Sequence, residues 1–569
     1  GLVILRSIQL PMLAWDIGAI IRGPVTRNDL RGTLIGAGLF FVFAAFTALS
    51  LHFRQKLGLQ LGENVIHDLR RDLFAKLMRL PLGYYTRTRL GRIISRFTSD
   101  AEAVRNGAQN VLFGGLIQVG SMVVAALMML SCDWRLFLVM MAMAPVLWVL
   151  NQHFRERLMR AYREVQESFS RVTTAVAESV KGIRVIQGFA RQEVNAGLFH
   201  ELVADHSQYN LRVTQTESVF LPLTELNSQF FLSVLVVVGG WRVLHPGGDL
   251  QVGDLLQFFF LANMFFNPIT SMGSLYNQAL TAVAGAERVF RMLDTKPDWE
   301  DPPGARPSGR LAGRVAFENV GFSYIPGRPV LRDIAFTAES GQSVALVGRT
   351  GSGKTTITGL IAKFYVPDAG RILIDGEDLR GLETASYRYN LGIVQQTNFL
   401  FTGTVRENIL MGRLGAPPEA AADAARRLEI LDMLEQLPQG LDTPVGEGGA
   451  GLSIGQRQII CFSRAMLADP RILILDEATS ALDTITELRL QTALQRLLTG
   501  RTSFIVAHRL STIRTADLVL VLEQGRIIES GSHRNLLKLG GAYARLYREF
   551  VVTQVADTPK VRGGQAASV

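Results

Sequence analysis

The run GQSVALVGRTGSGKTTITGLIAKFY, residues 341–365, decides the fold of the second half of the chain. Its apolar segment Ser343–Val347 predicts a buried strand. Gly348–Thr355 has the spacing G-x-x-x-x-G-K-T, and a helix is expected to begin inside it. A strand, a glycine-rich turn and a helix in this order predict a loop whose backbone N–H groups surround phosphates. We expect Lys354 to reach the β and γ phosphate oxygens and the Thr355 hydroxyl to bind Mg²⁺. The predicted phosphate-binding residues are Gly348, Arg349, Thr350, Gly351, Ser352, Gly353, Lys354, Thr355 and Thr356.

An acidic pair follows a second apolar run downstream, in RILILDEATS. Ile472–Leu475 predicts another buried strand, and Asp476 and Glu477 come directly after it. Beside a phosphate loop, one carboxylate can hold the Mg²⁺ shell, and the next can orient or deprotonate the attacking water. Two acids at a strand end can instead cap a helix, but a phosphate loop of this type requires such a pair. We therefore expect Asp476 to be a metal ligand.

The first half of the chain is much more apolar than the second. The chain of 569 residues is 48% hydrophobic, and the excess is concentrated before about residue 290. A helix needs roughly 20 apolar residues to cross the hydrocarbon core of a bilayer. Six runs are expected to do so, the first of them truncated because the chain starts at Gly1 and an N-terminal piece is expected to be absent. They are 7–21, 33–53, 106–132, 136–154, 218–241 and 255–286.

Positive charge gathers in two long connections between these runs. Residues 54–105 hold eleven Lys or Arg against five Asp or Glu, and residues 155–212 hold nine Lys or Arg. Both connections have helical periodicity, and the positive-inside rule places them in the cytoplasm. The net charge of +9 is therefore explained by a membrane protein, and no nucleic-acid partner is expected. The two cysteines, Cys132 and Cys461, do not suggest a disulfide framework.

Glu225 lies inside the fourth apolar run, where an acid is a candidate functional residue. Arg242 is expected to mark the outer end of that run, which places Glu225 close to the inner face. Two interpretations stay open, a residue at the cytoplasmic mouth and a contact with substrate. The amides in this part of the chain either line a polar passage or bond between helices, namely Asn227, Gln229, Asn263 and Asn267.

Five motifs occur in one order along the second half: the phosphate loop, QQTNFLFTGTVRENI, GAGLSIGQRQ, ILILDEATSALD and IVAHRLST. With these motifs and six apolar runs, the chain resembles an ABC exporter half-transporter along nearly its whole length. The resemblance implies an all-α transmembrane domain of six helices with long cytoplasmic extensions, fused to an α/β P-loop ABC ATPase domain. The expected limits are 1–293 for the transmembrane domain, 294–312 for a linker, 313–550 for the nucleotide-binding domain and 551–569 for a flexible tail.

The resemblance also implies roles for single residues. Tyr324 corresponds to the aromatic residue that stacks on adenine, and Gln396 to the glutamine that touches Mg²⁺ and water. Glu477 corresponds to the catalytic base and His508 to the histidine that contacts the γ-phosphate. Asp483 ends the loop Ser480–Asp483, which crosses the interface between two ATPase domains. ATP and Mg²⁺ are thus the expected cofactors.

The tag GAGLSIGQRQ, residues 449–458, has Ile454 where the family's Leu-Ser-Gly-Gly-Gln has its first glycine. The resemblance implies that the tag binds the ATP held by a second half-transporter, through Ser453, Gly455 and Gln456. The serine hydroxyl, the Gly455 backbone and the dipole of the following helix survive the change, so the tag is expected to work. A heterodimer and a homodimer are both compatible with Ile454, and the homodimer is favoured because the other motifs are whole.

The resemblance implies ATP-driven export of a hydrophobic or amphipathic substrate, such as a lipid, drug or peptide. An ATP-gated channel or a regulatory receptor on the same fold is the alternative. We expect the chain to lie in a lipid bilayer, in the bacterial inner membrane, with its ATPase domain in the cytoplasm. Short coupling helices are expected near Leu82–Thr88 and near Ala177–Ile183.

Overall fold

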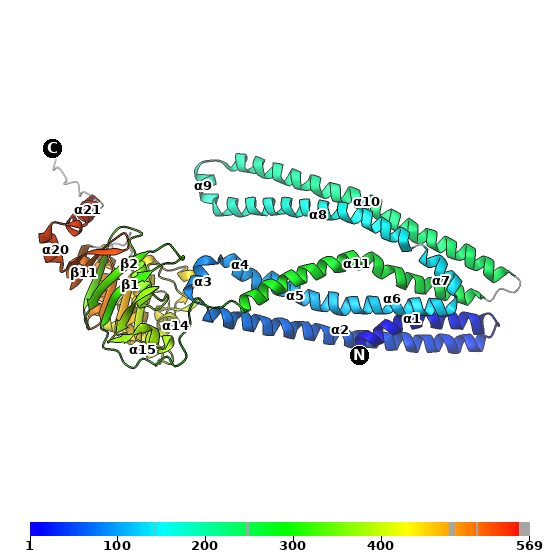
Figure 1. The fold of residues 1–569 in the computed structure, drawn as a ribbon, viewed down its shortest axis with the longest axis horizontal. Coiled ribbons are helices and arrows are strands. Elements are labelled where there is room, and N and C mark those ends of the chain that lie inside the picture. Colours follow the sequence, from blue (N-terminus) through cyan, green and yellow to red (C-terminus); the bar gives the residue numbers. More distant parts are fainter. Residues whose placement is uncertain (143, 246–249, 477–483, 508–509, 557–569) are drawn as a thin grey trace. The chain divides into compact units, whose positions relative to one another are not determined.

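The computed structural model describes residues 1–142, 144–245, 250–476, 484–507 and 510–556. The chain divides into two compact units, coloured along the sequence in Figure 1. The first unit comprises Gly1–Met78 and Leu90–Thr295, and the second comprises Arg79–Arg89 and Lys296–Val569. A short segment from the first half of the chain, Arg79–Arg89, therefore packs with the second half.

The first unit consists of long helices. They are α1 (Leu2–Ile20), α2 (Leu30–Arg79), α6 (Gly115–Cys132), α8 (Ala144–Lys181), α10 (Gln192–Leu244) and α11 (Val252–Leu293). Shorter segments join them, namely η1 (Ile21–Val25), α4 (Leu90–Ser95), η2 (Arg96–Asp100), α5 (Ala101–Asn106), η3 (Gly107–Gly114), α7 (Trp134–Met141) and α9 (Ile183–Gly188). Helix α8 packs along α10, and α1, α6 and α11 pack against one another (Figure 1). Their contact is apolar, with Ala14, Met129 and Phe258 fully or almost fully buried between them.

Four helical stretches among the described residues are long and apolar enough to cross a membrane: Leu2–Val25, Leu30–Arg79, Leu90–Cys132 and Val252–Leu293. They contain four of the six expected spans. The expected span 136–154 is divided between α7 and α8, which are separated at Ala142. The expected span 218–241 lies inside α10, where only Gln229–Leu244 forms a shorter apolar stretch. These two spans stay predictions.

The polar residues of the apolar runs lie on α10 and α11. The side chains of Glu225, Gln229, Asn263 and Asn267 are exposed in the single chain. Asn263 donates to the Phe259 carbonyl at 2.9 Å, within its own helix. A polar passage and bonding between helices therefore both stay predictions for these residues.

Two main sheets form the second unit, together with a two-stranded sheet of β7 (Gly403–Thr404) and β8 (Pro444–Val445). The larger has the order β12-β11-β3-β10-β9-β6, and its strands are parallel except for β12. Its strands are β3 (Ser343–Val347), β6 (Leu391–Val394), β9 (Ile472–Asp476), β10 (Thr502–Val506), β11 (Leu518–Glu523) and β12 (Arg526–Gly531). The smaller, antiparallel sheet has the order β2-β1-β4-β5. Its strands are β1 (Val315–Phe322), β2 (Leu331–Ala338), β4 (Ala369–Ile374) and β5 (Glu377–Asp378).

Helix α12 (Lys354–Ile361) packs with both sheets in one apolar core, into which it inserts Ile357, Leu360 and Ile361. A second core gathers helices that follow β6, namely α14 (Val405–Leu410), α15 (Glu419–Arg427), α16 (Leu431–Glu435), α17 (Ile454–Ala468) and α18 (Thr484–Leu498). The remaining elements are α3 (Leu82–Arg87), η4 (Leu379–Gly381), α13 (Thr384–Arg388), β7 (Gly403–Thr404), η5 (Gly440–Asp442), β8 (Pro444–Val445), η6 (Glu447–Gly449), α19 (Leu510–Thr515), α20 (His533–Leu539) and α21 (Ala542–Ala556).

The carboxyl ends of parallel strands meet at one edge of a sheet. Because β3, β6 and β9 are parallel, the residues after Val347, the residues after Val394, and Asp476 share that edge. The fold thus brings together three motifs that are far apart in the sequence.

The two expected coupling helices lie at the ends of long helices. Helix α3 occupies Leu82–Arg87, within the expected Leu82–Thr88. The expected segment Ala177–Ile183 covers the end of α8 and Gly182, and the short helix α9 begins only at Ile183. Both positions are breaks in otherwise continuous helical connections.

Candidate nucleotide site

The phosphate loop joins β3 to α12, and its glycines are required by the backbone. Gly348 has φ 156° and Gly353 has φ 104°, conformations that residues with a Cβ rarely adopt. A Cβ on Gly348 would lie 2.3 Å from the Leu522 carbonyl oxygen, and one on Gly353 would lie 2.5 Å from Leu331 Cδ2. Substitution would therefore clash with packed neighbours. The loop has the tight geometry that lets backbone N–H groups approach a phosphate.

Lys354 begins α12 and its side chain folds back over the loop. Its Nζ donates to the carbonyl oxygens of Gly348 at 2.7 Å and of Arg349 at 3.0 Å. Burial lowers the pKa of the Lys354 ammonium, and the nearby charge of Asp476 partly opposes this shift. The phosphate loop and the acidic end of β9 are therefore within electrostatic reach of each other.

Three hydroxyls of the loop have different environments. Ser352 Oγ is buried and has no hydrogen-bond partner among the described residues, whereas the Thr355 side chain is exposed at the first turn of α12. Thr356 Oγ1 and Tyr324 OH share a hydrogen bond of 3.1 Å. Arg349, Thr350 and Gly351 are exposed along the loop. An unpartnered buried hydroxyl beside an exposed one at a helix start suits a loop that receives phosphate and a hydrated cation.

Tyr324 lies two residues after the end of β1 and is 39% exposed, with its hydroxyl held at the phosphate-loop helix. Its ring packs edge-on against Phe322, at 4.9 Å between ring centroids, and against Tyr365, at 5.1 Å. The exposed ring is thus supported from behind and fixed beside the loop. This arrangement can present a stacking surface to a nucleotide base.

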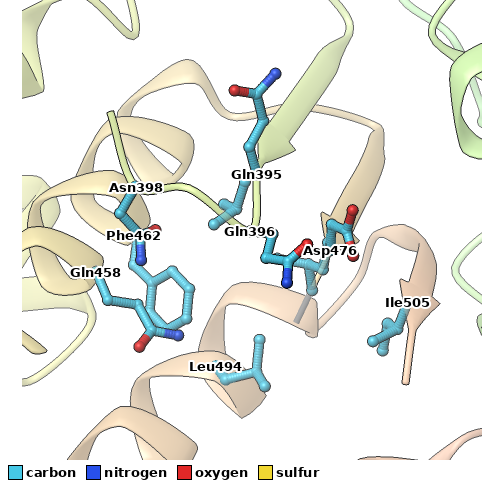
Figure 2. A pocket seen from close by; sticks show the side chains of 10 residues that line it. Gln395, Gln396, Asn398, Gln458, Phe462, Asp476, Leu494 and Ile505 are labelled. Atoms are coloured by element: carbon cyan, nitrogen blue, oxygen red, sulfur yellow. The ribbon is translucent and has the colours of Figure 1, made fainter. Parts of the chain in front are cut away.

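A small pocket joins the glutamine motif to the end of β9 (Figure 2). Gln396 and Asp476 lie close together on one side of it, whereas the amide of Gln395 points away from Asp476 in Figure 2. The pocket also contains Asn398 and Gln458, whose Oδ1 and Oε1 atoms are buried without a partner among the described residues. Sequence reasoning did not single out Asn398 or Gln458 for this pocket, although each lies inside a quoted motif.

The described part of the chain contains no cluster of three or more His, Cys, Asp or Glu that could hold a metal ion by itself. Mg²⁺ beside phosphates uses few protein ligands and keeps several waters. Thr355, Gln396 and Asp476 supply a hydroxyl, an amide and a carboxylate at the same strand edge. The residues fit the ion. Glu477, Asp483 and His508 lie outside the described residues, so their expected roles stay predictions.

The altered tag forms the beginning of α17. Ser453 is its N-cap: the Gln456 backbone N–H donates to Ser453 Oγ at 3.2 Å, and the Ser453 backbone N–H donates to Gln456 Oε1 at 2.8 Å. This reciprocal capping box leaves the Ser453 hydroxyl proton available as a donor. Gly455 is buried, and the Ile454 side chain is 43% exposed at the first helical position. The substitution of glycine by isoleucine therefore does not disturb the cap.

Comparison with known proteins agrees with this architecture. Residues 2–269 match the model of the ABC transporter transmembrane region, and residues 331–480 match that of the ABC transporter family. The uncharacterized ABC transporter ATP-binding protein YknV of Bacillus subtilis is 37% identical over 95% of this chain and 89% of its own length. The ATP-dependent lipid A-core flippase of Aromatoleum aromaticum is 36% identical over 99% of this chain and 94% of its own.

A solved structure of a bacterial Atm1-family ABC exporter with ATP bound superimposes with a TM-score of 0.78 and 26% identity, covering 100% of this chain and 98% of that one. Because these relatives are similar over nearly the full length, the family assignment holds for the whole chain and not for one domain alone. The chain therefore belongs to the ABC transporters, as an exporter-type half-transporter that joins a transmembrane region to one ATPase domain.

Proposed function

We propose that this chain couples ATP hydrolysis to the export of an amphipathic substrate, with lipids as the first class to test. The observation that carries the proposal is the packing of α3. This helix lies in the chain between the apolar helix α2 and the membrane-unit helix α4, yet it belongs to the compact unit that contains the phosphate loop. A change in the nucleotide unit can thus act directly on the chain between two membrane-unit helices. The naming of relatives as lipid A-core flippases supports a lipid.

In the proposed mechanism, two half-transporters bind two ATP molecules. The phosphate loop of one half holds the triphosphate, Tyr324 supports the base, and the capped Ser453 of the other half donates its hydroxyl to the γ-phosphate. Thr355, Gln396 and Asp476 would hold Mg²⁺, which neutralises charge on the β and γ phosphates when bound. Glu477 then orients or deprotonates the attacking water, and His508 contacts the γ-phosphate.

Transport follows if ATP binds more tightly to the closed pair of ATPase domains than to the open pair. Binding then shifts the population of the transmembrane units toward the outward-open state, and hydrolysis resets it. We propose a homodimer in the bacterial inner membrane with the ATPase domains in the cytoplasm. The homodimer is tested by expressing two differently tagged copies of the chain together and purifying through one tag. Recovery of the other tagged copy is expected, and recovery of a different half-transporter without it would exclude the homodimer.

Transport itself is tested in inverted membrane vesicles with fluorescent phospholipid, an amphipathic dye and a labelled peptide. We expect ATP-dependent accumulation of at least one of them, and none with the Glu477→Gln variant. A passive flux that ATP merely permits, without accumulation, would contradict an exporter and support the channel alternative.

A further inference from the structure

The segment between the membrane unit and β1 was expected to be a plain linker, but its first part is bound to the ATPase unit on two sides. On one side, Asp298 accepts from Arg87 of α3 at 2.5 Å. A Cβ on Gly83 would lie 2.7 Å from Asp298 Oδ2, so the absence of a side chain at Gly83 permits this approach. Residues 298–301, here named the strap, thus contact α3 directly.

On its other side, the strap is fixed to the end of the phosphate-loop helix. Trp299 Nε1 donates to the Phe364 carbonyl at 3.4 Å, and Lys363 Nζ donates to Asp301 Oδ1 at 2.8 Å. The Lys363 side chain is 2% exposed and the Asp301 side chain 27%, so the ammonium is buried while the carboxylate still reaches water. The strap therefore holds the residues directly before Tyr365.

Tyr365 connects this anchor to the proposed base-binding surface. Its ring meets Tyr324 at 5.1 Å and 86°, and meets Phe322 at 5.4 Å. A Cβ on Gly359 of α12 would lie 3.3 Å from Tyr365 Cδ2, so the ring also rests on the phosphate-loop helix. Tyr365 thus lies between the strap, α12 and Tyr324.

Residues of α3 also influence the phenol of Tyr365 electrostatically. Burial and the neighbouring Tyr324 raise its pKa, and Thr86 and Arg87 of α3 partly lower it. Two residues of α3 are therefore close enough to affect the group that supports Tyr324 from behind.

We propose that Tyr365 is a positioning residue that links α3, through the strap, to the surface on which the nucleotide base stacks. The proposal rests on the proposed role of Tyr324 in binding the base. Movement of α3 pulls on Asp298, the strap transmits the pull to Lys363–Tyr365, and the Tyr324 ring shifts beside the phosphate loop. As a physical consequence, a movement in the membrane unit changes the affinity of the nucleotide site for the base of ATP, and not only for its phosphates.

The experiment uses the full chain in vesicles of phosphatidylethanolamine and phosphatidylglycerol. ATPase activity is measured against ATP concentration, and inorganic tripolyphosphate serves as a competitor that has no base. Tyr324→Ala is expected to raise the KM for ATP about threefold to tenfold because the stacking surface for the base is lost, and Tyr365→Leu by a similar factor because the edge-on contact that supports Tyr324 is lost. The kcat and the inhibition constant of tripolyphosphate are expected to stay unchanged, and Tyr365→Phe should restore the KM.

The link to α3 is tested by Arg87→Gln, with Arg89→Gln as its matched control. Arg89 is exposed and makes no hydrogen bond or ion pair with the described residues. We expect Arg87→Gln to raise the KM for ATP about twofold to threefold, and to add nothing in the Tyr365→Leu background. Arg89→Gln should behave as the parent protein.

The outcomes separate this inference from the proposed site. If Tyr324→Ala leaves the KM for ATP unchanged, the proposed base site itself is wrong. If Tyr324→Ala raises the KM for ATP but Tyr365→Leu does not, the positioning role of Tyr365 is overturned. The same holds if Tyr365→Leu raises the inhibition constant of tripolyphosphate as much as it raises the KM for ATP. Full additivity of Arg87→Gln and Tyr365→Leu would overturn the link to α3.

Discussion

Replacement of Ser453 separates the helix-capping role that the structure shows from the proposed role of the same hydroxyl in binding phosphate. As N-cap of α17, Ser453 accepts from the Gln456 backbone N–H at 3.2 Å. In the proposed dimer, the same hydroxyl donates its proton to the γ-phosphate held by the other half. Ser453→Ala removes both interactions, whereas Ser453→Asp keeps the cap, because aspartate caps helices as well as serine does. The aspartate, however, places a negative charge against the phosphate.

The expected magnitudes follow from these two interactions. Loss of an N-cap costs about 1 kcal/mol of stability, and loss of a hydrogen bond to a charged group costs about 1.5–3 kcal/mol. At about 1.4 kcal/mol per factor of ten, Ser453→Ala should lower ATPase activity about 10- to 150-fold. Its free energy of unfolding should fall by only about 1 kcal/mol. Ser453→Asp should unfold like the parent protein and yet lose at least as much activity.

The assay pairs nucleotide-free thermal unfolding with ATPase rates at saturating ATP. Ser453→Thr is the matched control, since threonine keeps both the cap and a hydroxyl donor. If Ser453→Asp retained more than about a third of the parent activity, a change below about 0.7 kcal/mol in the barrier, the hydroxyl would not act on phosphate. The tag would then be a structural cap alone.

Three further substitutions test the rest of the site. Asp301→Asn should cost about 1.5–3 kcal/mol in urea unfolding, because the buried Lys363 ammonium loses its charged partner and keeps only its bond to the Leu382 carbonyl, and a loss below about 1 kcal/mol would contradict that pairing. Burial would raise the pKa of the Asp301 carboxyl, but bonds from Lys363 and Thr384 lower it below its usual value. The parent protein should therefore hold this stabilisation above about pH 4 and lose it on further acidification, whereas the variant should show no such loss. Gly353→Ala should abolish binding of a fluorescent ATP analogue, because a Cβ there would lie 2.5 Å from Leu331 Cδ2, and normal binding would show that the loop can rearrange. Glu477→Gln should bind ATP and barely hydrolyse it, and near-normal turnover in a phosphate-release assay would remove Glu477 from the role of base.

The parts of this protein that sequence could predict are those encoded by neighbouring residues. The glycine spacing of residues 348–353 specifies positive φ angles, and Lys354 follows in fixed register, so the geometry of the loop was predictable before any fold was known. The length of the apolar runs predicted a membrane protein for the same reason, because hydrophobic length is a local property. The capping box of α17 is likewise encoded by neighbouring residues, in the S-x-x-Q pattern of Ser453–Gln456.

Other features needed the tertiary structure because they join residues that are distant in sequence. Gln396 meets Asp476 only because β6 and β9 are neighbours and parallel in the sheet. The sequence predicts only a linker at 294–312, and the structure adds that Asp301 in it pairs with Lys363, 62 positions away. Sequence periodicity describes which face of an element is apolar, but strand order and the packing of α12 between two sheets decide which side chains meet. The sequence by itself thus determined the protein class, a membrane protein with a P-loop ATPase domain, because local patterns encode both. Only the fold decided which distant residues lie around the phosphate loop and that α3 contacts the strap.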